Sequence, residues 1–254
     1  MREILRAEAL AVRYPGQAVP VLVDFTVSLS CGSIVALLGP SGVGKSSLLR
    51  VLAGLSPPSA GRVLIKGVPL RAPHPDVAIV FQDPCLLPWL DLEGNVGFGL
   101  SLRSRKCRSN RERSARIEAA ITTVGLSAAR HLRPAQLSGG MASRAALARC
   151  LACRPEILLL DEPFAALDEI TRADLQRLLA DLVAESNLAA LLVTHDIDEA
   201  LLLADRLILI GGTPARILAT WTVSLPRPRQ EFLVDLSSLR LEILSHLRTS
   251  LRRH

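Results

Sequence analysis

Residues 39–46, GPSGVGKS, fit the pattern GxxxxGKS and decide the fold. They follow a compact apolar run at 33–38 that is typical of a buried strand, and they open a helical pattern that extends from 45 to 55. Glycines in such a loop let backbone N–H groups wrap around phosphates, and the helix N-terminus adds positive potential. A loop of this sequence between a strand and a helix therefore predicts a phosphate-binding site.

Each position of this loop has an expected task in holding ATP. Lys45 would neutralise the β- and γ-phosphates, and Ser46 would coordinate Mg2+. The structural alternative is a glycine-rich turn with an exposed lysine, which the flanking strand and helix make the weaker interpretation. The residues expected to contact the nucleotide are Gly39, Pro40, Ser41, Gly42, Val43, Gly44, Lys45, Ser46 and Ser47.

A second pattern, ILLLDE at 157–162, is an apolar strand that ends in two acids. Asp161 is expected to hold the magnesium ion, usually through water, and Glu162 to orient and polarise the attacking water. Acids at this place also commonly cap the following helix, so the pattern alone says little. Joined to the phosphate loop, it predicts a site for ATP hydrolysis.

A third pattern, LSGGM at 137–141, precedes a helix expected at 142–152. Ser138, Gly139 and Gly140 would present a hydroxyl, backbone N–H donors and a helix N-terminus, which suit a γ-phosphate. For an isolated Ser-Gly-Gly, a serine-capped helix start is the commoner explanation. With this motif, one chain carries two expected phosphate sites.

Strand-like apolar runs alternate with helical patterns along the whole chain. Two alternating segments, 5–14 and 21–30, predict antiparallel strands joined by a turn at Pro15 and Gly16. From about 84 to 133 the pattern changes to helices with charged faces, which indicates a helical insertion. Further strands are expected at 62–65, 77–81, 157–160, 189–194, 207–210 and 215–220, and further helices at 170–185, 198–205 and 231–251.

The order of these elements predicts an α/β fold. We expect a P-loop NTPase core with a mainly parallel sheet, an N-terminal antiparallel β subdomain and an inserted helical subdomain. The expected boundaries are 1–229 for the ATPase domain, with the helical subdomain at about 84–155, and 230–254 for a C-terminal helical tail. The ligand-binding loops then belong at the carboxyl ends of the strands.

Composition narrows the classes of function. Hydrophobic residues make up 49% of the 254 residues, which suggests apolar surface covered by partners. No apolar run reaches the roughly 18 to 20 residues that cross a bilayer, and MREILRAEALAVRY lacks secretory features, so a cytoplasmic location is expected. The net charge is +6, and the densest basic run, 103–116, has no aromatic residues. A solvated face is therefore favoured over a nucleic-acid site, and proximity to a membrane fits equally well.

The cysteines are better explained as reduced thiols than as a disulfide framework, because there are five and no secretory signal. Cys150 and Cys153 form a CxxC, which raises a redox or zinc interpretation. However, a second pair is missing and the spacing falls inside an expected helix. Buried structural thiols are favoured.

The three motifs, in this order and spacing, resemble those of the ATP-binding subunits of ABC transporters, and the resemblance covers nearly the whole chain. Tyr14 resembles the aromatic residue that stacks on adenine, Gln82 the Q-loop glutamine, and His195 in VTHD the switch histidine that contacts the γ-phosphate. Residues 165–168 look like the D-loop, which implies that Asp168 lies near the nucleotide. As alternatives, Tyr14 would be a core residue and His195 a structural one.

The resemblance implies an ABC ATPase architecture and a division of tasks among these residues. The implied catalytic group is Glu162, His195, Lys45 and Gln82, and the implied metal-binding group is Ser46, Gln82 and Asp161.

The family also implies partners. Two subunits face head to tail, so that the LSGG of one closes on the ATP held by the other; this implies a homodimer, or a pair with a related ATPase. The pair would act on transmembrane permease subunits and, through the complex, on an extracytoplasmic solute-binding protein, at the cytoplasmic face of the inner membrane. The expected docking surface is 82–90, with Leu86, Leu87 and Trp89; a small subdomain core explains these residues equally well.

Several segments are similar to importers of the nitrate, sulfonate, taurine and pyrimidine-precursor group, namely FQDPCLLPW, LSGGM, DEPFAALD and LPRPR. The implied function is ATP-driven import of a small solute. Met141 stands where many relatives have glutamine, and Ala142 and Ser143 replace the usual polar or basic pair before Arg144. These departures bear on γ-phosphate affinity rather than on the class.

Two other functions compete with import. A soluble ABC-type ATPase of translation or DNA repair usually has two ATPase halves or a long coiled-coil insertion, and this chain has neither pattern. A nucleotide-gated binding subunit that hydrolyses little is disfavoured by the presence of Glu162 and His195.

Overall fold

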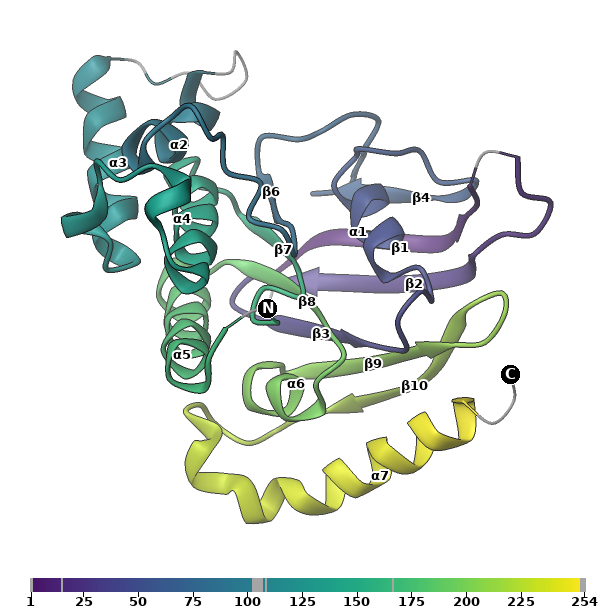
Figure 1. Ribbon diagram of the computed structural model, residues 1–254. Coiled ribbons are helices and arrows are strands. Elements are labelled where there is room, and N and C mark those ends of the chain that lie inside the picture. Colours follow the sequence, from purple (N-terminus) through teal and green to yellow (C-terminus); the bar gives the residue numbers. More distant parts are fainter. Residues whose placement is uncertain (1, 15, 102–106, 108, 166, 252–254) are drawn as a thin grey trace. The chain divides into compact units, whose positions relative to one another are not determined.

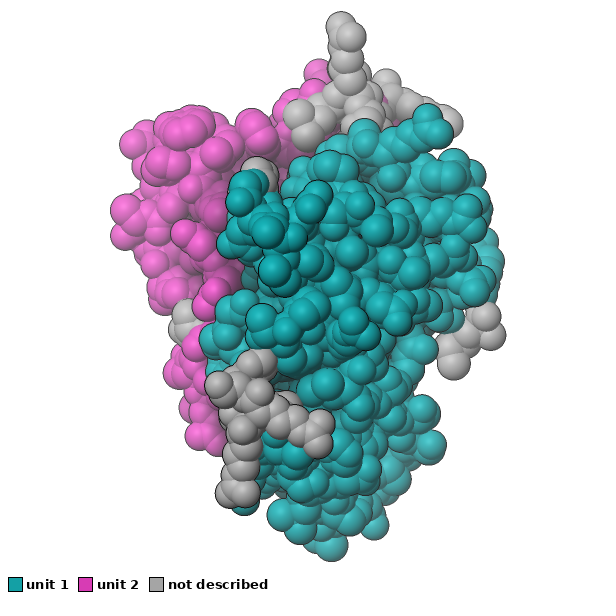
Figure 2. All heavy atoms as spheres, turned by 90° about the vertical axis from the view of Figure 1, so that its right-hand side faces the viewer, with its two compact units in different colours: residues 1–74, 180–254 teal, residues 75–179 magenta. Residues whose placement is uncertain are grey.

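The computed structural model describes residues 2–14, 16–101, 107, 109–165 and 167–251 (Figure 1). The chain divides into two compact units (Figure 2). The first unit comprises residues 1–74 and 180–254, and the second comprises residues 75–179. The division falls within helix α5 (Glu169–Ser186).

The first unit contains a four-stranded antiparallel sheet in the order β2-β1-β4-β5. Alternating burial along β1 and β2 explains why the sequence shows the strand period there. The expected hairpin is present, although Pro15 of its turn lies outside the described residues. The strands are β1 (Glu3–Val12), β2 (Leu22–Ser30), β4 (Ala60–Ile65) and the two-residue β5 (Val68–Pro69).

The same unit holds a mainly parallel group of strands in the order β10-β9-β3-β8. β3 (Ile34–Leu38) lies between β8 (Ala189–Thr194) and β9 (Arg206–Gly211) and is parallel to both. β10 (Arg216–Thr222) pairs antiparallel with β9. Every residue of β3 and β8 is buried, which is why these strands appear in the sequence as continuous apolar runs.

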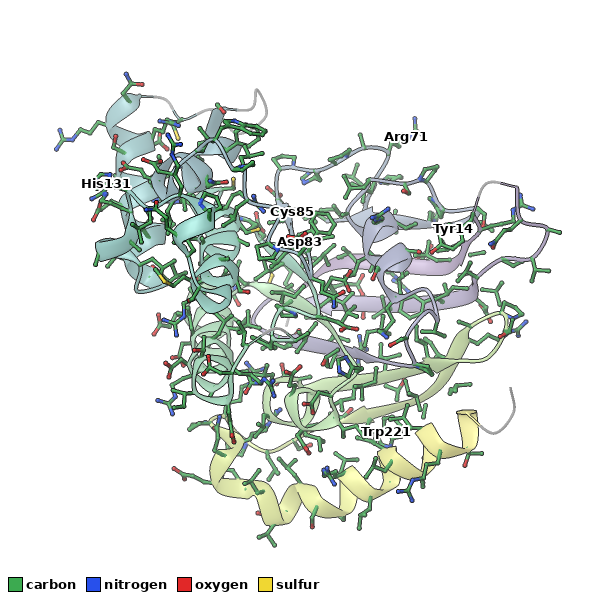
Figure 3. All side chains as sticks on the ribbon, in the orientation of Figure 1. Tyr14, Arg71, Asp83, Cys85, His131 and Trp221 are labelled. Carbon is green, nitrogen blue, oxygen red and sulfur yellow. The ribbon has the colours of Figure 1, made fainter. Side chains whose placement is uncertain are left out.

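Helices connect and cover these strands. α1 (Lys45–Leu52) follows β3, and α6 (Ile197–Leu203) follows β8. After a short helix, η5 (Arg229–Phe232), the chain ends in α7 (Leu233–Leu251), which lies along α6 and β10 (Figure 1). Side-chain hydrogen bonds fasten α7. Arg240 Nε donates to Asp198 Oδ1 at 2.6 Å, and Trp221 Nε1, labelled in Figure 3, donates to Glu242 Oε1 at 2.8 Å.

The segment that leads into this tail is anchored by a buried arginine. Arg229 is only 1% exposed, and its guanidinium donates to the carbonyls of Leu201, Ala204 and Val223. Burial lowers the pKa of Arg229, and the carboxylate of Asp205 opposes that effect. Arg229 thus anchors the segment that leads into α7.

The second unit combines a pair of parallel strands with helices, and it includes the first part of α5. β6 (Val77–Val80) pairs with β7 (Ile157–Asp161). The helices α2 (Leu92–Phe98), α3 (Asn110–Thr123) and α4 (Gly139–Ala152) pack on one another. α4 begins three residues earlier than the expected 142, because Ser138 caps it. Among the residues that the structure describes, short helical turns connect these elements, namely η1 (Gly99–Ser101), η3 (Ser127–Ala129) and η4 (Pro134–Gln136).

Candidate functional site

The loop after β3 is shaped by glycines that no larger residue could replace. A Cβ on Gly39 would lie 2.7 Å from the carbonyl oxygen of Ile210, and a Cβ on Gly44 would lie 2.7 Å from Val21 Cγ1. Gly44 also has a φ of 101°, in the left-handed region that favours glycine. The loop therefore keeps its backbone close to the strands beneath it, while Ser41 and Gly42 are exposed.

Lys45 is the first residue of α1, and its side chain folds back over the loop. Its Nζ donates to the carbonyl of Gly39 at 2.8 Å and to that of Pro40 at 2.9 Å, and the residue is only 5% exposed. The alternative of an exposed lysine is therefore wrong. Because the ammonium lies inside the loop, it concentrates positive charge where an anion would meet the loop's N–H groups.

The side chains beside the loop present two hydroxyls and a tyrosine. Ser46 is exposed at the start of α1, and the hydroxyl of Ser47 forms a hydrogen bond with that of Tyr14. Tyr14 is 45% exposed (Figure 3), so it is not a core residue. An open hollow beside Tyr14 is lined by Arg13, Gly16, Gln17, Ala18, Pro57, Pro58 and Ser59.

His195 follows β8 and belongs to the same unit as the loop. It is exposed, and the residues around it are tied together. Thr194 Oγ1 donates to Glu199 Oε2 at 2.6 Å and accepts from the N–H of Asp196 at 3.0 Å. The Asp196 carboxylate in turn caps α6. Sequence reasoning missed Thr194 and Glu199; the signal was THDIDE, in which both flank the histidine.

In the second unit, Gln82 and Glu162 follow two paired parallel strands. Val80 of β6 pairs with Leu160 of β7, so the residues two places further on leave from the same edge. Asp161 is buried, whereas Gln82 is exposed and Glu162 is half-buried. Glu162 has a φ of 46°, a left-handed conformation that costs a non-glycine residue about 1 kcal/mol or more and that clusters at functional sites.

The LSGGM motif forms the first turn of α4. Ser138 Oγ accepts from the N–H of Met141 at 3.3 Å, so the serine does cap the helix. Ser138 and Gly139 are exposed. A Cβ on Gly140 would lie 2.6 Å from Thr171 Cγ2, so the helix start requires a glycine there. The arrangement leaves a hydroxyl and a helix N-terminus open to an anion.

Asp168 lies at the start of α5 and is exposed. Its Oδ1 accepts from the N–H of Thr171 at 3.0 Å, and this hydrogen bond holds the pKa of the Asp168 carboxyl below its ordinary value. Ala166, in the expected D-loop, lies outside the described residues.

The expected docking segment has one fully projecting aromatic residue. Trp89 is 68% exposed, and Leu86 and Leu87 are half-buried. Trp89 is therefore not part of a subdomain core. Of the expected basic run, residues 103–106 and 108 lie outside the described residues.

Both cysteines of the CxxC pair lie buried in the protein interior as free thiols. Cys150 and Cys153 are free and buried, and their thiols donate to the carbonyls of Ile79 and Arg149. In the part of the chain that the structure describes, no group of three or more His, Cys, Asp or Glu side chains is placed so that it could hold a metal ion. Among the same residues, none of the helices is both long and apolar enough to span a bilayer.

Comparison with known proteins gives a consistent result. A family model described as "ABC transporter" matches residues 22–165. The chain is 43% identical over 224 residues to an aliphatic sulfonates import ATP-binding protein, SsuB 2, of Burkholderia cenocepacia, covering 88% of this chain and 80% of the relative. It is 45% identical over 215 residues to a taurine import ATP-binding protein, TauB, of Pseudomonas fluorescens, covering 85% and 80%.

Solved structures agree with these relatives. The ATP-binding cassette MJ0796, in a dimeric post-hydrolysis state bound to ADP and Pi, matches with a TM-score of 0.78 and 28% identity, covering 88% of this chain and 100% of that one. CbiO1 from Clostridium perfringens, part of the transporter complex cbiONQ, matches with a TM-score of 0.78 and 27% identity, covering 98% and 100%. The expected P-loop NTPase fold is confirmed.

Proposed function

This chain belongs to the ABC transporter family, and from that premise we propose that it drives the import of a small solute of the nitrate, sulfonate or taurine kind. It is the ATP-binding and ATP-hydrolysing subunit of such a system. The observation that carries the proposal is the loop at 39–46, in which Gly39 and Gly44 leave no room for side chains and Lys45 is buried. A loop of that shape and charge suits the phosphates of ATP.

Nucleotide binding rests on the first unit. The backbone of residues 39–44 would donate to the phosphates, with Lys45 supplying the positive charge and Ser47 a hydroxyl. Tyr14 would stack on adenine, which its 45% exposure permits. For this, the hydrogen bond between Tyr14 and Ser47 would have to open.

The residues present fit magnesium by their chemistry. The hydroxyl of Ser46, the amide oxygen of Gln82 and the carboxylate of Asp161 would each offer a hard oxygen donor of the kind that Mg2+ prefers. When bound, the ion would supply charge neutralisation at the β- and γ-phosphates.

Hydrolysis would depend on two side chains. Glu162 would accept a hydrogen bond from the attacking water and orient it in line with the γ-phosphorus. His195 would donate to a γ-phosphate oxygen as charge develops there, and its exposed position after β8 leaves it accessible. The network of Thr194, Asp196 and Glu199 supports the backbone that carries His195.

The dimer gives the second phosphate site its purpose. Ser138, Gly139 and Gly140 would grip the γ-phosphate of an ATP held by the partner subunit, and Asp168 would lie near that interface. Hydrolysis would remove the phosphate that both subunits hold. Because the dimer binds ATP more tightly than ADP, the two subunits would then separate, and this opening is the movement passed to the permease.

The remaining partners follow from the import role. Permease subunits would receive the motion through 82–90, where Trp89 is 68% exposed, and a solute-binding protein would deliver the solute from outside the cell. We place the subunit at the cytoplasmic face of the inner membrane.

Reconstituted transport tests this function. Proteoliposomes containing this chain, its permease subunits and a solute-binding protein should take up radiolabelled taurine, an alkanesulfonate or nitrate only when Mg-ATP is present on the side of this chain. Uptake that proceeds equally with the Glu162→Gln variant, or uptake of none of the three solutes despite ATP hydrolysis, would refute the proposal as stated.

A further inference from the structure

Arg149 joins two distant parts of the second unit. It lies near the end of α4, and its guanidinium reaches the chain just beyond Gln82. Nη1 donates to the carbonyl of Cys85 and Nη2 to the carbonyl of Pro84, both at 2.7 Å. One planar side chain thus holds two successive carbonyls, a geometry that the fork of arginine fits and a single ammonium does not.

The segment that Arg149 holds is bent in an unusual way. Cys85 has a φ of 47°, a left-handed conformation that is unfavourable for a residue with a Cβ. The N–H of Cys85 donates to Asp83 Oδ1 at 2.9 Å, and the two residues lie together in the loop after β6 (Figure 3). Asp83 on one side and Arg149 on the other therefore stabilise this bend.

The other end of the segment is fastened to α2. Asn95 is fully buried, and its Nδ2 donates to the carbonyls of Leu87, Leu90 and Asp91 at 3.0–3.2 Å. Its Oδ1 accepts from the N–H of Leu87 at 2.7 Å. Residues 84–91 are thus held at one end by α4 and at the other by α2, and Trp89 projects from the part that α2 holds.

Helix α4 has a different task at its other end. Its first turn is the Ser138-Gly139-Gly140 motif, ten residues before Arg149, which is about 15 Å along a helix axis. The thiol of Cys150 also donates to the carbonyl of Ile79 in β6, the strand that leads to Gln82. The helix is therefore bonded both to the strand before Gln82 and to the bend after it.

We propose that Arg149 is a positioning residue that makes residues 84–90 and α4 move as one body. A displacement of the docking segment by a permease helix would then reach the phosphate-gripping turn at Ser138, and closure of that turn on ATP would reach the docking segment. The inference rests on the proposed function, because it needs both the ATP-bound dimer and a docking partner.

Hydrogen exchange read by mass spectrometry tests this on the full chain. The parent is Glu162→Gln, with and without Mg-ATP, and the two peptides of interest cover 83–91 and 138–148. In the parent, Mg-ATP should slow exchange in both peptides by about tenfold. With Arg149→Gln added, it should slow exchange only in 138–148. Arg149→Lys, which can reach one carbonyl, should give an intermediate response in 83–91.

A matched control shows whether the effect of Arg149→Gln comes from the lost link between α4 and residues 84–90 or merely from removal of an arginine. Arg130, in the same unit, pairs with the carboxylates of Glu93 and Glu118 and holds no carbonyl of the docking segment. Arg130→Gln should leave the ATP response of both peptides as in the parent.

The outcomes are distinct. If 83–91 still responds to Mg-ATP in Arg149→Gln as in the parent, the coupling role is wrong. If that variant does not fold, a folded Arg149→Lys with the parent's full response overturns the proposal. If neither peptide of the parent responds to Mg-ATP, the proposed function fails, and this inference fails with it.

Discussion

Leu38 of β3 and Thr194 of β8 are register partners across two adjacent parallel strands. The residues that follow them, Gly39 and His195, therefore leave the sheet side by side at its carboxyl edge. In sequence they are 156 positions apart (195 − 39). This pairing explains how the loop at 39–46 and His195 come to lie together within one unit, at the strand edge where ligand-binding loops belong.

Removing the charge inside the loop should weaken binding of ATP itself. In Lys45→Ala, the affinity for Mg-ATP measured by isothermal titration calorimetry should fall about tenfold or more, because charge-assisted contacts to the phosphates are lost. Arg71→Ala, which removes an exposed positive charge of the same unit, should bind Mg-ATP as the wild type does. Unchanged affinity in Lys45→Ala would mean that the loop is not the phosphate site.

Two glycine substitutions should separate steric crowding from backbone strain. Gly39→Ala places a Cβ 2.7 Å from a backbone oxygen, so we expect a loss of about 2 kcal/mol in the free energy of unfolding and weaker ATP binding. Gly67→Ala meets no atom within 4 Å but has a φ of 79°, so it should cost about 1 kcal/mol and leave ATP affinity unchanged. Urea denaturation and nucleotide titration check both; equal effects on ATP affinity would contradict this account.

Glu199 should matter for turnover more than for binding. Glu199→Ala leaves the buried hydroxyl of Thr194 without its acceptor, which should cost about 2 kcal/mol in unfolding free energy. Misplacement of His195 should then lower kcat about tenfold or more, while the Kd for Mg-ATP stays near that of the wild type. Glu199→Gln keeps an acceptor oxygen and should retain most of kcat. If the alanine variant lost binding and turnover in equal measure, the positioning role would be wrong.

The cap at Asp168 should make local stability depend on acid pH. Its folded-state pKa is lowered by the hydrogen bond from Thr171, so the stabilisation is fully present above the unfolded-state pKa, about 3.9 for aspartate. It is lost as pH falls through the lower, folded-state pKa. The difference in unfolding free energy between wild type and Asp168→Ala should therefore be largest near neutrality and vanish in strong acid. A difference that grows on acidification would show the opposite linkage.

The sequence predicts those features that depend on residues close together in the chain. A buried strand followed by GPSGVGKS and a helix predicts the tight glycine loop that the structure shows, and Asp161 lies buried at the end of an apolar strand as its pattern indicates. The start of α4 is predicted less well. The sequence pattern predicts a helix from 142, because two glycines weaken the helical signal, whereas the helix begins at Gly139, where Ser138 caps it.

Long-range backbone contacts were not predictable in this way. Arg149 binds carbonyls 64 and 65 positions away, and a carbonyl is the same in every residue, so no side-chain pattern marks its partner. Arg229 is likewise buried against three carbonyls, and no side-chain pattern in the sequence marks those partners. The left-handed backbone of Glu162 is likewise invisible in the sequence, since nothing in a glutamate favours a positive φ.

In the proposed dimer, the Ser138-Gly139-Gly140 turn of one subunit closes on the ATP that the other subunit holds, and Glu162 is needed only for turnover. Light scattering coupled to size-exclusion chromatography of Glu162→Gln tests it most directly. The variant should be monomeric without nucleotide and should become a stable dimer with Mg-ATP, with no measurable phosphate release. A monomer at saturating Mg-ATP, or phosphate release at the wild-type rate, would contradict the account.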